Sequence, residues 1–444
     1  MHLIVELTKY MMLLLLGNYT YFSFRVFLYK NKRKQERTYS LLTVLIFLLH
    51  FIGYFTLFIQ LWNVKLLVLY GAEVLLFALI LIFYRLFYPK LSKLLLRNML
   101  MLLSVGFIVL ARLSFNKAVW QVTIVAAAFL AGLFVPIIIK KATWLYRFGW
   151  VYGALGILLL AVVLYAGTTK YGATNWLSIG GISIQPSEFV KLLYVFCIAA
   201  LFQKGTDFKR ICAITILAAA HVLILVLQTD LGGALIFFVT YIFMLYAATS
   251  QPIYFLGGLA GGSVAAYAAY RMFGHVRVRV MAWRNPLGYI DKEGYQISQS
   301  LFAIGTGGWF GMGLNQGLPT GIPVVDSDFI FSAISEELGG FFAICIILLY
   351  INCFIVLINL SLGHEETFPR LLSLGFSVMF GFQVILSIGG VIKFIPSTGV
   401  TLPLISSGGS SMVSTILMFM ILQGLYLLRK TEKKDTIPPE KITS

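Results

Sequence analysis

Charged residues are scarce in this chain. They make up 11% of its 444 residues, whereas hydrophobic residues make up 59%, and the mean hydropathy is +0.90. This composition leaves too little polar surface for a soluble domain with one core, so that class is excluded. Acidic residues number 17 against 34 lysines and arginines, a net charge of +17. The basic residues gather in short breaks between apolar runs rather than along one face, so we expect no nucleic-acid partner.

Cysteine is also rare. Cys197, Cys212, Cys345 and Cys353 lie inside apolar runs, with no CxxC pair and no histidine at metal-ligand spacing. We interpret them as small hydrophobic residues and expect neither disulfides nor a zinc site. The N-terminal run lacks a preceding basic segment and a following cleavage site, so we expect a retained membrane segment rather than a signal peptide.

Long apolar runs, in contrast, are abundant. A helix needs about 20 residues to cross a bilayer. Thirteen runs reach or approach this length: 3–29, 40–62, 66–88, 98–115, 119–139, 148–167, 187–203, 211–227, 231–248, 252–273, 329–360, 371–393 and 405–428. The sequence therefore predicts an all-α polytopic membrane protein. The run 329–360 is so long that it must tilt or begin outside the bilayer.

The basic breaks predict the orientation of these crossings. Lysines and arginines gather at 30–37, 90–97, 140–147, 204–210 and 429–434, and on a thirteen-pass path these basic segments all fall on the same side of the membrane. Positive charge marks the cytoplasmic side, so the N-terminus is predicted outside and the C-terminus inside. The breaks 168–187 and 394–404, the position of Asp230 and the loop 274–328 then share the outer face.

Asp230 is the most conspicuous of the outer residues, because it separates the runs 211–227 and 231–248. A carboxylate at the border of two membrane-length segments is costly unless it is solvated, paired or used. By position alone, a functional site and a solvated loop residue are equally good interpretations. Four predicted helices begin on this face, and their positive dipole ends make an anion site plausible.

Other polar residues have two interpretations each. Glu188 and Lys191 form an i, i+3 pair that either serves a site or, as the residues alone favour, pins a helix at the interface. A stripe of Asp328, Ser332, Ser335, Glu336 and Gly339 favours a face toward a cavity or the bundle. The run 406–411 suits either close ligand approach or helix packing. His50 and His221 lie singly in apolar runs, where bundle hydrogen bonding is expected.

The outer loop alternates basic and apolar residues from His275 to Arg284, as an interfacial or strand-like segment would. Basic residues on that side suggest an anionic ligand or headgroup. Its glycine-rich part, 305–313, follows no predicted strand and so is a poor candidate for a nucleotide loop.

Six ordered motifs resemble one family, the shape, elongation, division and sporulation (SEDS) proteins of the RodA and FtsW type. They are Asn175-Trp176-Leu177 with Gln185-Pro186-Ser187-Glu188 and Lys191; Gln228-Thr229-Asp230-Leu231-Gly232; Gly294-Tyr295-Gln296 with Gln299-Ser300-Leu301; Asp328-Phe329-Ile330-Phe331; Glu336-Glu337-Leu338-Gly339; and Pro396-Ser397-Thr398-Gly399 with Leu402-Pro403 and Ser407-Gly408-Gly409-Ser410-Ser411. The resemblance implies a ten-helix membrane core at 98–428 with a large extracellular loop at 274–328. An N-terminal extension, 1–97, adds about three transmembrane helices without an implied role, and a tail at 429–444 is expected to be disordered.

The resemblance also implies a function. Such proteins are peptidoglycan glycosyltransferases that polymerise lipid II, an undecaprenyl-pyrophosphate-linked substrate, on the outer face of the cytoplasmic membrane, with a class B penicillin-binding protein as partner. The aspartate matching Asp230 is essential in that family, and we predict that it is the general base. The predicted substrate-binding residues are Trp176, Glu188, Lys191, Arg277, Arg279, Asp328, Glu336, Lys393, Ser407, Gly408, Gly409 and Ser410. No cofactor is certain; helix N-termini, Lys191, Lys393, Arg277, Arg279 and Arg284 could offset the leaving charge, together with Mg²⁺ or Mn²⁺ held by oxygen ligands. The alternatives are a lipid II flippase or transporter, and a non-catalytic scaffold for a transpeptidase.

Overall fold

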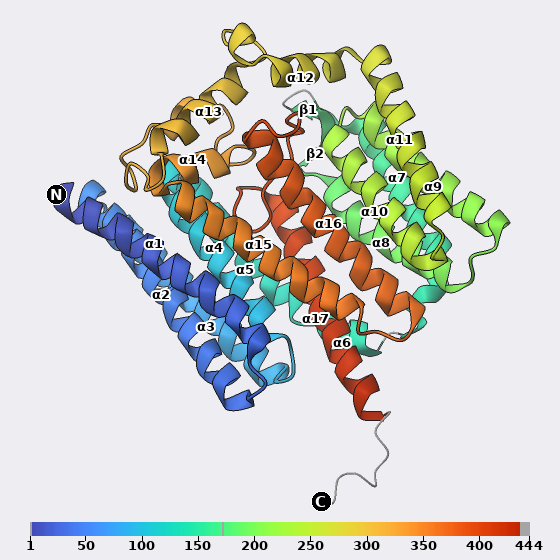
Figure 1. The fold of residues 1–444 in the computed structure, drawn as a ribbon, viewed down its shortest axis with the longest axis horizontal. Helices are drawn as coiled ribbons and strands as arrows, with labels where there is room; N and C mark the ends of the chain where they lie inside the picture. Colours follow the sequence, from blue (N-terminus) through green and yellow to red (C-terminus); the bar gives the residue numbers. More distant parts are fainter. Residues whose placement is uncertain (1, 142, 171–172, 436–444) are drawn as a thin grey trace, which may run out of the picture.

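The computed structural model describes residues 2–141, 143–170 and 173–435, and it is built almost entirely from helices (Figure 1). Within these ranges, thirteen helices are long and apolar enough to cross a membrane, which confirms the polytopic helical fold. They are α1 (His2–Arg25), α2 (Lys32–Leu61), α3 (Val64–Phe87), α4 (Lys93–Leu113), α5 (Phe115–Gly132) continued by α6 (Val135–Lys141), α7 (Gly149–Ala166), α8 (Pro186–Gln203), α9 (Phe208–Leu227), α10 (Leu231–Thr249), α11 (Pro252–Met272), α15 (Gly340–Ser361), α16 (Thr367–Val391) and α17 (Gly409–Asp435). Shorter helices are α12 (Gly274–Arg284), α13 (Tyr295–Gly307) and α14 (Ile330–Leu338).

The helices differ greatly in how much of their surface the protein covers. In α4, the stretch from Asn98 to Ala111 is buried throughout, and α8, α16 and α17 are largely buried as well. Helix α11, at the periphery, has no buried residue. Since apolar side chains meet lipid as readily as protein, this exposed helix needs no covering partner. Helix α16 lies between α15 on one side and α8 and α10 on the other (Figure 1).

The first three helices form a group at one side of the bundle, drawn in blue in Figure 1, with α1 against α15, α2 against α4, and α3 against α5. Buried polar contacts hold this group together, and one of them joins it to the rest of the chain. His50 Nε2 lies 3.0 Å from Glu73 Oε2, and Tyr54 donates to Glu73 across 2.8 Å. The other ring nitrogen of His50 lies 3.0 Å from Ser104 Oγ of α4. The expected bundle hydrogen bonding of His50 is therefore present.

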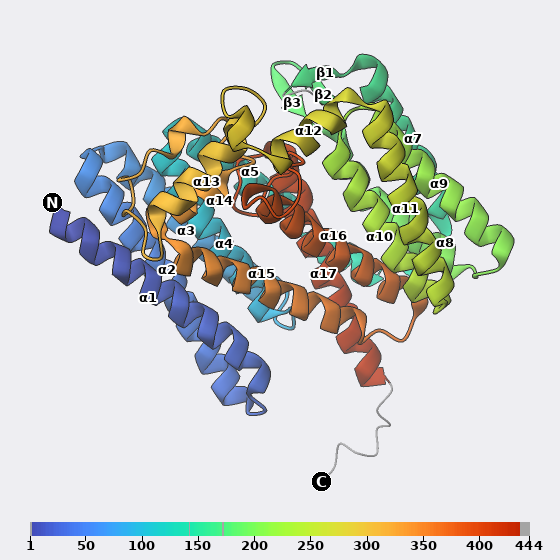
Figure 2. The ribbon, with the colours of Figure 1, turned by 45° about the horizontal axis from the view of Figure 1, so that its top comes forward.

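A small antiparallel sheet occupies the break before α8, where the sequence predicted no regular structure. Its strands are β1 (Thr168–Lys170), β2 (Ala173–Ile179) and β3 (Ile182–Ile184), in the order β1-β2-β3. Gly180 and Gly181 have φ values of 58° and 83°, as a two-residue hairpin turn requires. The all-helical prediction missed this element. The sheet lies beside the ends of α7 and α12 (Figure 2).

The predicted run 329–360 is two helices rather than one. Gly339, at φ 90°, separates α14 from α15. A Cβ atom at Gly339 would lie 2.4 Å from the backbone nitrogen of Gly311, and one at Gly311 would lie 2.4 Å from the carbonyl oxygen of Glu337. Two backbones therefore cross here without room for a side chain, so α14 ends because the chain must turn, not because hydrophobicity falls.

Two further predictions need correction. The segment 275–284 is helix α12, so the strand-like interpretation was wrong. The tail predicted to be disordered begins as helix, because α17 continues to Asp435; once a packed helix exists, adding a turn requires no new nucleation. Residues 436–444 lie outside the described part of the chain.

Candidate functional site

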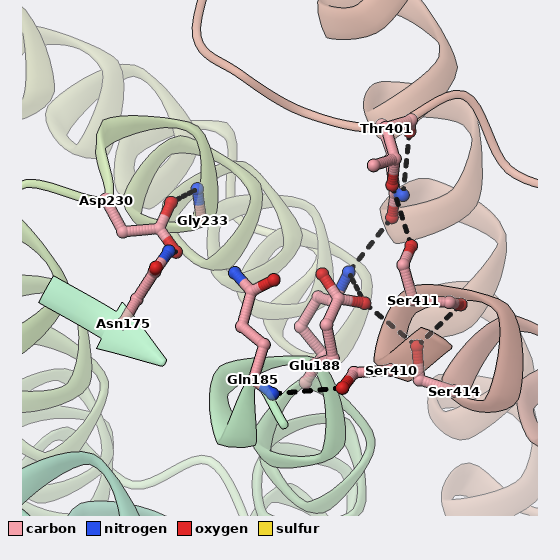
Figure 3. Close-up of polar contacts among 11 residues, drawn as sticks. Asn175, Gln185, Glu188, Asp230, Gly233, Thr401, Ser410, Ser411 and Ser414 are labelled. Carbon is pink, nitrogen blue, oxygen red and sulfur yellow. Dashed lines mark hydrogen bonds and ion pairs between the residues drawn. The ribbon is translucent and has the colours of Figure 1, made fainter. Parts of the chain in front are cut away.

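Asp230 caps the N-terminus of α10 and faces the small sheet. Its Oδ1 accepts a hydrogen bond from the backbone N–H of Gly233 across 2.8 Å, and its Oδ2 accepts one from Asn175 Nδ2 across 3.1 Å. Figure 3 shows the carboxylate held between these two donors. A carboxylate has about four lone-pair positions, so two bonds leave each oxygen able to accept another proton donor. The side chain is only partly buried, which leaves it open to a ligand.

The turn that carries Asp230 is fixed by its neighbours. The backbone N–H of Thr174, in β2, donates to the carbonyl oxygen of Gln228 across 3.0 Å, and Gln228 Nε2 donates to the carbonyl oxygen of Leu160 across 2.7 Å. Thr229 adopts a left-handed conformation with φ 61°. The sheet and α7 thus hold the last turn of α9 on both sides, which sets the direction of the carboxylate.

The loop 394–404 packs directly against the start of α10. A Cβ atom at Gly232 would lie 2.3 Å from Val400 Cγ2 and 3.1 Å from the carbonyl oxygen of Thr398. Glycine is therefore needed for this approach. As a result, the motif that contains Asp230 and the motif at 396–399 meet at one place, although about 170 residues separate them.

Arg279 lies beside the same loop, and the negative charges of two carboxylates act on it. Its Nη1 donates to the carbonyl oxygen of Ser397 across 3.0 Å. Burial lowers the pKa of Arg279, and the negative charges of Asp230 and Asp328 oppose that change. An arginine remains protonated even so, which gives the site a fixed positive charge.

Asp328 completes this group. Its Oδ2 lies 3.5 Å from where a Cβ of Gly399 would stand. Burial raises the pKa of Asp328 to about 6, although a hydrogen bond from Ser327 and the charge of Arg279 pull it down. Loop 394–404 therefore has Asp230, Arg279 and Asp328 around it.

Glu188 and Lys191 anchor a second polar cluster among α8, α16 and α17. Lys191 Nζ lies 2.7 Å from Glu188 Oε2, and it also donates to Gln383 Oε1 across 3.1 Å. Ser414 donates to Glu188 Oε2 across 2.9 Å, and the cluster continues to Thr401 of the same loop through Gln383. Both charged side chains are largely buried. The bond from Ser414 of α17 to Glu188 (Figure 3) and the bond from Lys191 to Gln383 of α16 join helices inside the bundle. The pair does more than pin one helix at an interface.

The helix N-termini expected to bind an anion are partly filled by the protein itself. Asp230 occupies the N-terminus of α10. The backbone N–H of Gln185, just before α8, donates to Ser410 Oγ across 2.9 Å. The N–H groups of Ser407 and Gly408, just before α17, donate to the carbonyl oxygen of Asp326 and to Gln121 Oε1. Gly409, also predicted to bind substrate, is the first residue of α17. The segment 406–411 therefore holds the loops together through its backbone and hydroxyl groups.

The remaining predicted residues are more dispersed. Glu336 accepts a hydrogen bond from the backbone N–H of Leu318, and its neighbour Glu337 pairs with Arg112 across 2.7 Å, in a cluster of their own. Arg277 is exposed on α12. Lys393 follows α16 in a left-handed conformation, and its carbonyl oxygen accepts from Trp283 Nε1 across 3.1 Å. Trp176 lies half-buried on β2, next to Asn175. Arg284, like Arg277, is exposed.

Several residues of the two clusters could not be recognised as site residues from the sequence. Gln383, Thr401 and Ser414 are neutral and lie in or beside apolar runs, although Ser414 stands one helical turn from Ser410. Arg112 was visible as a lone charge in its run, but its partner Glu337 could not be inferred. Among the described residues, no group of three or more His, Cys, Asp or Glu side chains gathers as a metal site would.

The model of the FtsW, RodA and SpoVE family, described as a cell cycle protein, matches residues 86–431. The chain is 35% identical over 326 residues to the peptidoglycan glycosyltransferase RodA of Mycobacterium tuberculosis, which covers 69% of each chain. It is 34% identical over 278 residues to stage V sporulation protein E of Bacillus subtilis, covering 60% of this chain and 75% of the other.

Solved structures agree with this assignment. A chain from a peptidoglycan synthase complex that coordinates polymerization and crosslinking superposes with a TM-score of 0.65 at 25% identity, covering 77% of this chain and 99% of that one. The rod shape determining protein RodA of Thermus thermophilus has a TM-score of 0.55 at 25% identity, covering 79% and 99%. The chain is therefore a multi-pass membrane protein that belongs to the FtsW, RodA and SpoVE family of cell cycle proteins, the SEDS family.

Proposed function

We propose that this chain polymerises lipid II into glycan strands at the outer face of the cytoplasmic membrane, with Asp230 as the general base. Its family membership makes it a peptidoglycan glycosyltransferase. The observation that carries the role of Asp230 is its carboxylate, which is aimed by Gly233 and Asn175 while both oxygens keep lone pairs free.

The reaction assigns a clear task to that carboxylate. A sugar hydroxyl attacks the anomeric carbon of a lipid-linked sugar, the new C–O bond forms, and the bond from that carbon to the pyrophosphate oxygen breaks. Asp230 takes the hydroxyl proton, and the polyprenyl pyrophosphate leaves with the bonding electrons. Positive charge near the leaving group favours this step, and Arg279 supplies a fixed charge beside loop 394–404.

The polar cluster around Lys191 supports loop 394–404 from the other side. Gln383 connects Lys191 to the carbonyl oxygen of Thr401 through bonds of 3.1 Å each. In this proposal Glu188 orients Lys191, and the pair positions the loop through Gln383; the ammonium of Lys191 is the charge of the pair that favours a leaving pyrophosphate. No step is assigned to a divalent cation.

The orientation and the partner belong to the same proposal. The basic breaks all fall on one side of a thirteen-pass path, which supports a cytoplasmic C-terminus and an outer Asp230. A structural relative belongs to a complex that coordinates polymerization with crosslinking. A class B penicillin-binding protein is accordingly the proposed partner.

The decisive experiment compares Asp230→Asn with Asp207→Asn. Asp207 caps the N-terminus of α9 by accepting from the backbone N–H of Arg210, so it matches the capping role of Asp230 at a different helix. Purified protein with its partner should polymerise lipid II in the unaltered and Asp207→Asn forms, and lose polymerisation in the Asp230→Asn form while staying folded.

Three results would contradict the proposal. Polymerisation retained by Asp230→Asn removes the base assignment. If lipid II crosses liposome membranes without polymerisation, and this movement depends on a proton gradient, the protein is a transporter. Full function of the assembled complex with Asp230→Asn indicates a scaffold.

A further inference from the structure

The N-terminal helices contact a loop that the family-matched region supplies. The family match begins at residue 86, so α1, α2 and nearly all of α3 lie outside it. The loop, residues 308–318, joins α13 to the segment before α14, and we call it the brace loop. The first half of α1 passes beside it (Figure 1, Figure 2).

Gln60, in the last turn of α2, makes three hydrogen bonds to the brace loop. Its Nε2 donates to the carbonyl oxygen of Leu314 across 2.8 Å. Its Oε1 accepts from Asn315 Nδ2 across 3.3 Å and from Gln316 Nε2 across 2.8 Å. One side chain thus holds three consecutive loop residues, and Asn315 is in a left-handed conformation with φ 63°.

Helix α1 holds the preceding part of the same loop. Lys9 Nζ donates to the carbonyl oxygen of Gly311 across 3.1 Å, and the side chain is 8% exposed. Tyr10 packs edge-on against Phe310, with ring centroids 5.7 Å apart. Gly313 has a φ of 106°, which favours glycine, and a Cβ there would lie 2.9 Å from Val5 Cγ1, so α1 comes close to the loop at this position.

The brace loop in turn surrounds the end of α14. The N–H groups of Met312 and Gly313 donate to the carbonyl oxygens of Glu336 and Glu337, each across 2.9 Å. Leu318 N–H donates to Glu336 Oε1 across 3.0 Å. Arg112 contacts both sides, since it pairs with Glu337 and donates to the carbonyl oxygen of Gly317 across 2.9 Å. A displacement of the brace loop would therefore also displace α14.

The extension itself is fixed well enough to act as a support. Besides the buried contacts of His50, Tyr19 of α1 donates to Asn98 Oδ1 of α4 across 3.0 Å, and Asn98 donates to Asn352 Oδ1 of α15 across 2.8 Å. These side chains are buried, and polar groups without water strongly prefer the one register that pairs them.

We propose that α1 and α2 brace the loop 308–318, and that Gln60 is a positioning residue that holds α14, and with it Asp328, in the geometry the reaction needs. Asp328 stands two residues before α14 and close to Arg279, so displacement of α14 reaches the candidate site. The catalytic part of this inference rests on the proposed function, whereas the bracing itself does not.

The test measures hydrogen exchange and kinetics on the full chain, with Gln60→Leu set against the matched control Asn18→Leu. Asn18 is an exposed amide of α1 that donates to the carbonyl oxygen of Leu14 in its own helix. Loss of three hydrogen bonds should make peptides covering 308–318 exchange roughly tenfold faster or more in Gln60→Leu. With lipid II as substrate, kcat should fall several-fold while KM changes little, because the loss concerns geometry rather than substrate binding. Gln60→Glu, which keeps the two accepting bonds, should recover part of both losses.

A second approach alters the loop instead of the extension. Gln316→Ala removes the 2.8 Å bond to Gln60 Oε1 and leaves the left-handed Asn315 in place, so it should reproduce part of the faster exchange even if Gln60→Leu fails to fold. Unchanged exchange in these variants overturns the brace. Faster exchange with unchanged kcat overturns the positioning role. If the unaltered protein does not polymerise lipid II at all, the proposed function fails, and the exchange result still decides whether the brace exists.

Discussion

Asn175 donates a hydrogen bond across 3.1 Å to the carboxylate of Asp230, from a strand to the start of a helix 55 residues later. The side chain of Asn175 is buried, and its own Oδ1 has no partner in the described structure. Asn175 therefore orients Asp230 and leaves a buried acceptor beside it.

Replacing Asn175 should weaken catalysis without unfolding the protein. A hydrogen bond to a charged group contributes about 1.5–3 kcal/mol, so Asn175→Ala should lower kcat for lipid II polymerisation by roughly 10- to 100-fold. Asn175→Asp should lower it further, because it places a second negative charge against Asp230. Kinetics of both variants, with Asn18→Ala as a control for a lost exposed amide, check this. Equal activity of Asn175→Ala and the unaltered protein would remove the orienting role.

The buried ion pair of Glu188 and Lys191 makes a prediction about stability. Removing one partner leaves an uncompensated charge, so Lys191→Met should reduce the free energy of unfolding by about 3–5 kcal/mol. Adding Glu188→Gln removes that charge and should restore much of the loss. Unfolding of the two single variants and the double variant in detergent measures the coupling. Purely additive losses would contradict a direct pair.

The contact between Gly232 and Val400 predicts that a substitution at Gly232 lowers stability and polymerisation, and that a second substitution, at Val400, restores part of both. Gly232→Ala should destabilise by about 1–3 kcal/mol through overpacking and reduce polymerisation by displacing loop 394–404. Val400→Ala in the same chain removes the nearest clashing atom and should recover both properties in part. Gly261→Ala on α11, where a Cβ meets nothing within 4 Å, serves as the control. Failure of Val400→Ala to help would show that the contact is not the cause.

The raised pKa of Asp328 predicts a pH dependence. The folded state titrates this carboxyl at about 6, whereas an unperturbed aspartate titrates at about 4. Between these values the folded state binds more protons than the unfolded chain, so the contribution of Asp328 to stability falls as pH rises through this window. Thermal unfolding from pH 4 to 8 measures the difference in Tm between the unaltered protein and Asp328→Asn. This difference should shift in favour of the variant as pH rises to 6, and then stay constant. A difference independent of pH would contradict the assigned pKa.

Hydropathy and motif order predicted most of the fold, but not its breaks. The run 329–360 reads as one segment because the few polar residues near its start, such as Ser335 and Glu336, fit a polar stripe on one continuous helix. They belong instead to the separate buried helix α14, which ends at Gly339 because two backbones cross there. The sheet at 168–184 was missed because its strands are short and lie between two membrane helices.

The candidate site was predicted where charge drew attention to it. Asp230, Glu188, Lys191 and Asp328 are rare charges beside apolar runs, whereas Gln383 and Ser414 are neutral and bond to partners about 190 or more residues away. Arg277 and Arg279 looked equivalent in an alternating pattern. In helix α12, residues two apart point to nearly opposite sides, so one is exposed and the other contacts the site.

The backbone crossing of Gly311 and Gly339 has a consequence for the history of this family. Any side chain at Gly311 or Gly339 would collide with main-chain atoms of the other segment. A substitution at either position therefore cannot be compensated by a smaller side chain nearby. Relatives that keep this crossing are expected to carry glycine at both positions. Those that lose one glycine are expected to have rebuilt the brace loop by insertion or deletion, not by single substitutions.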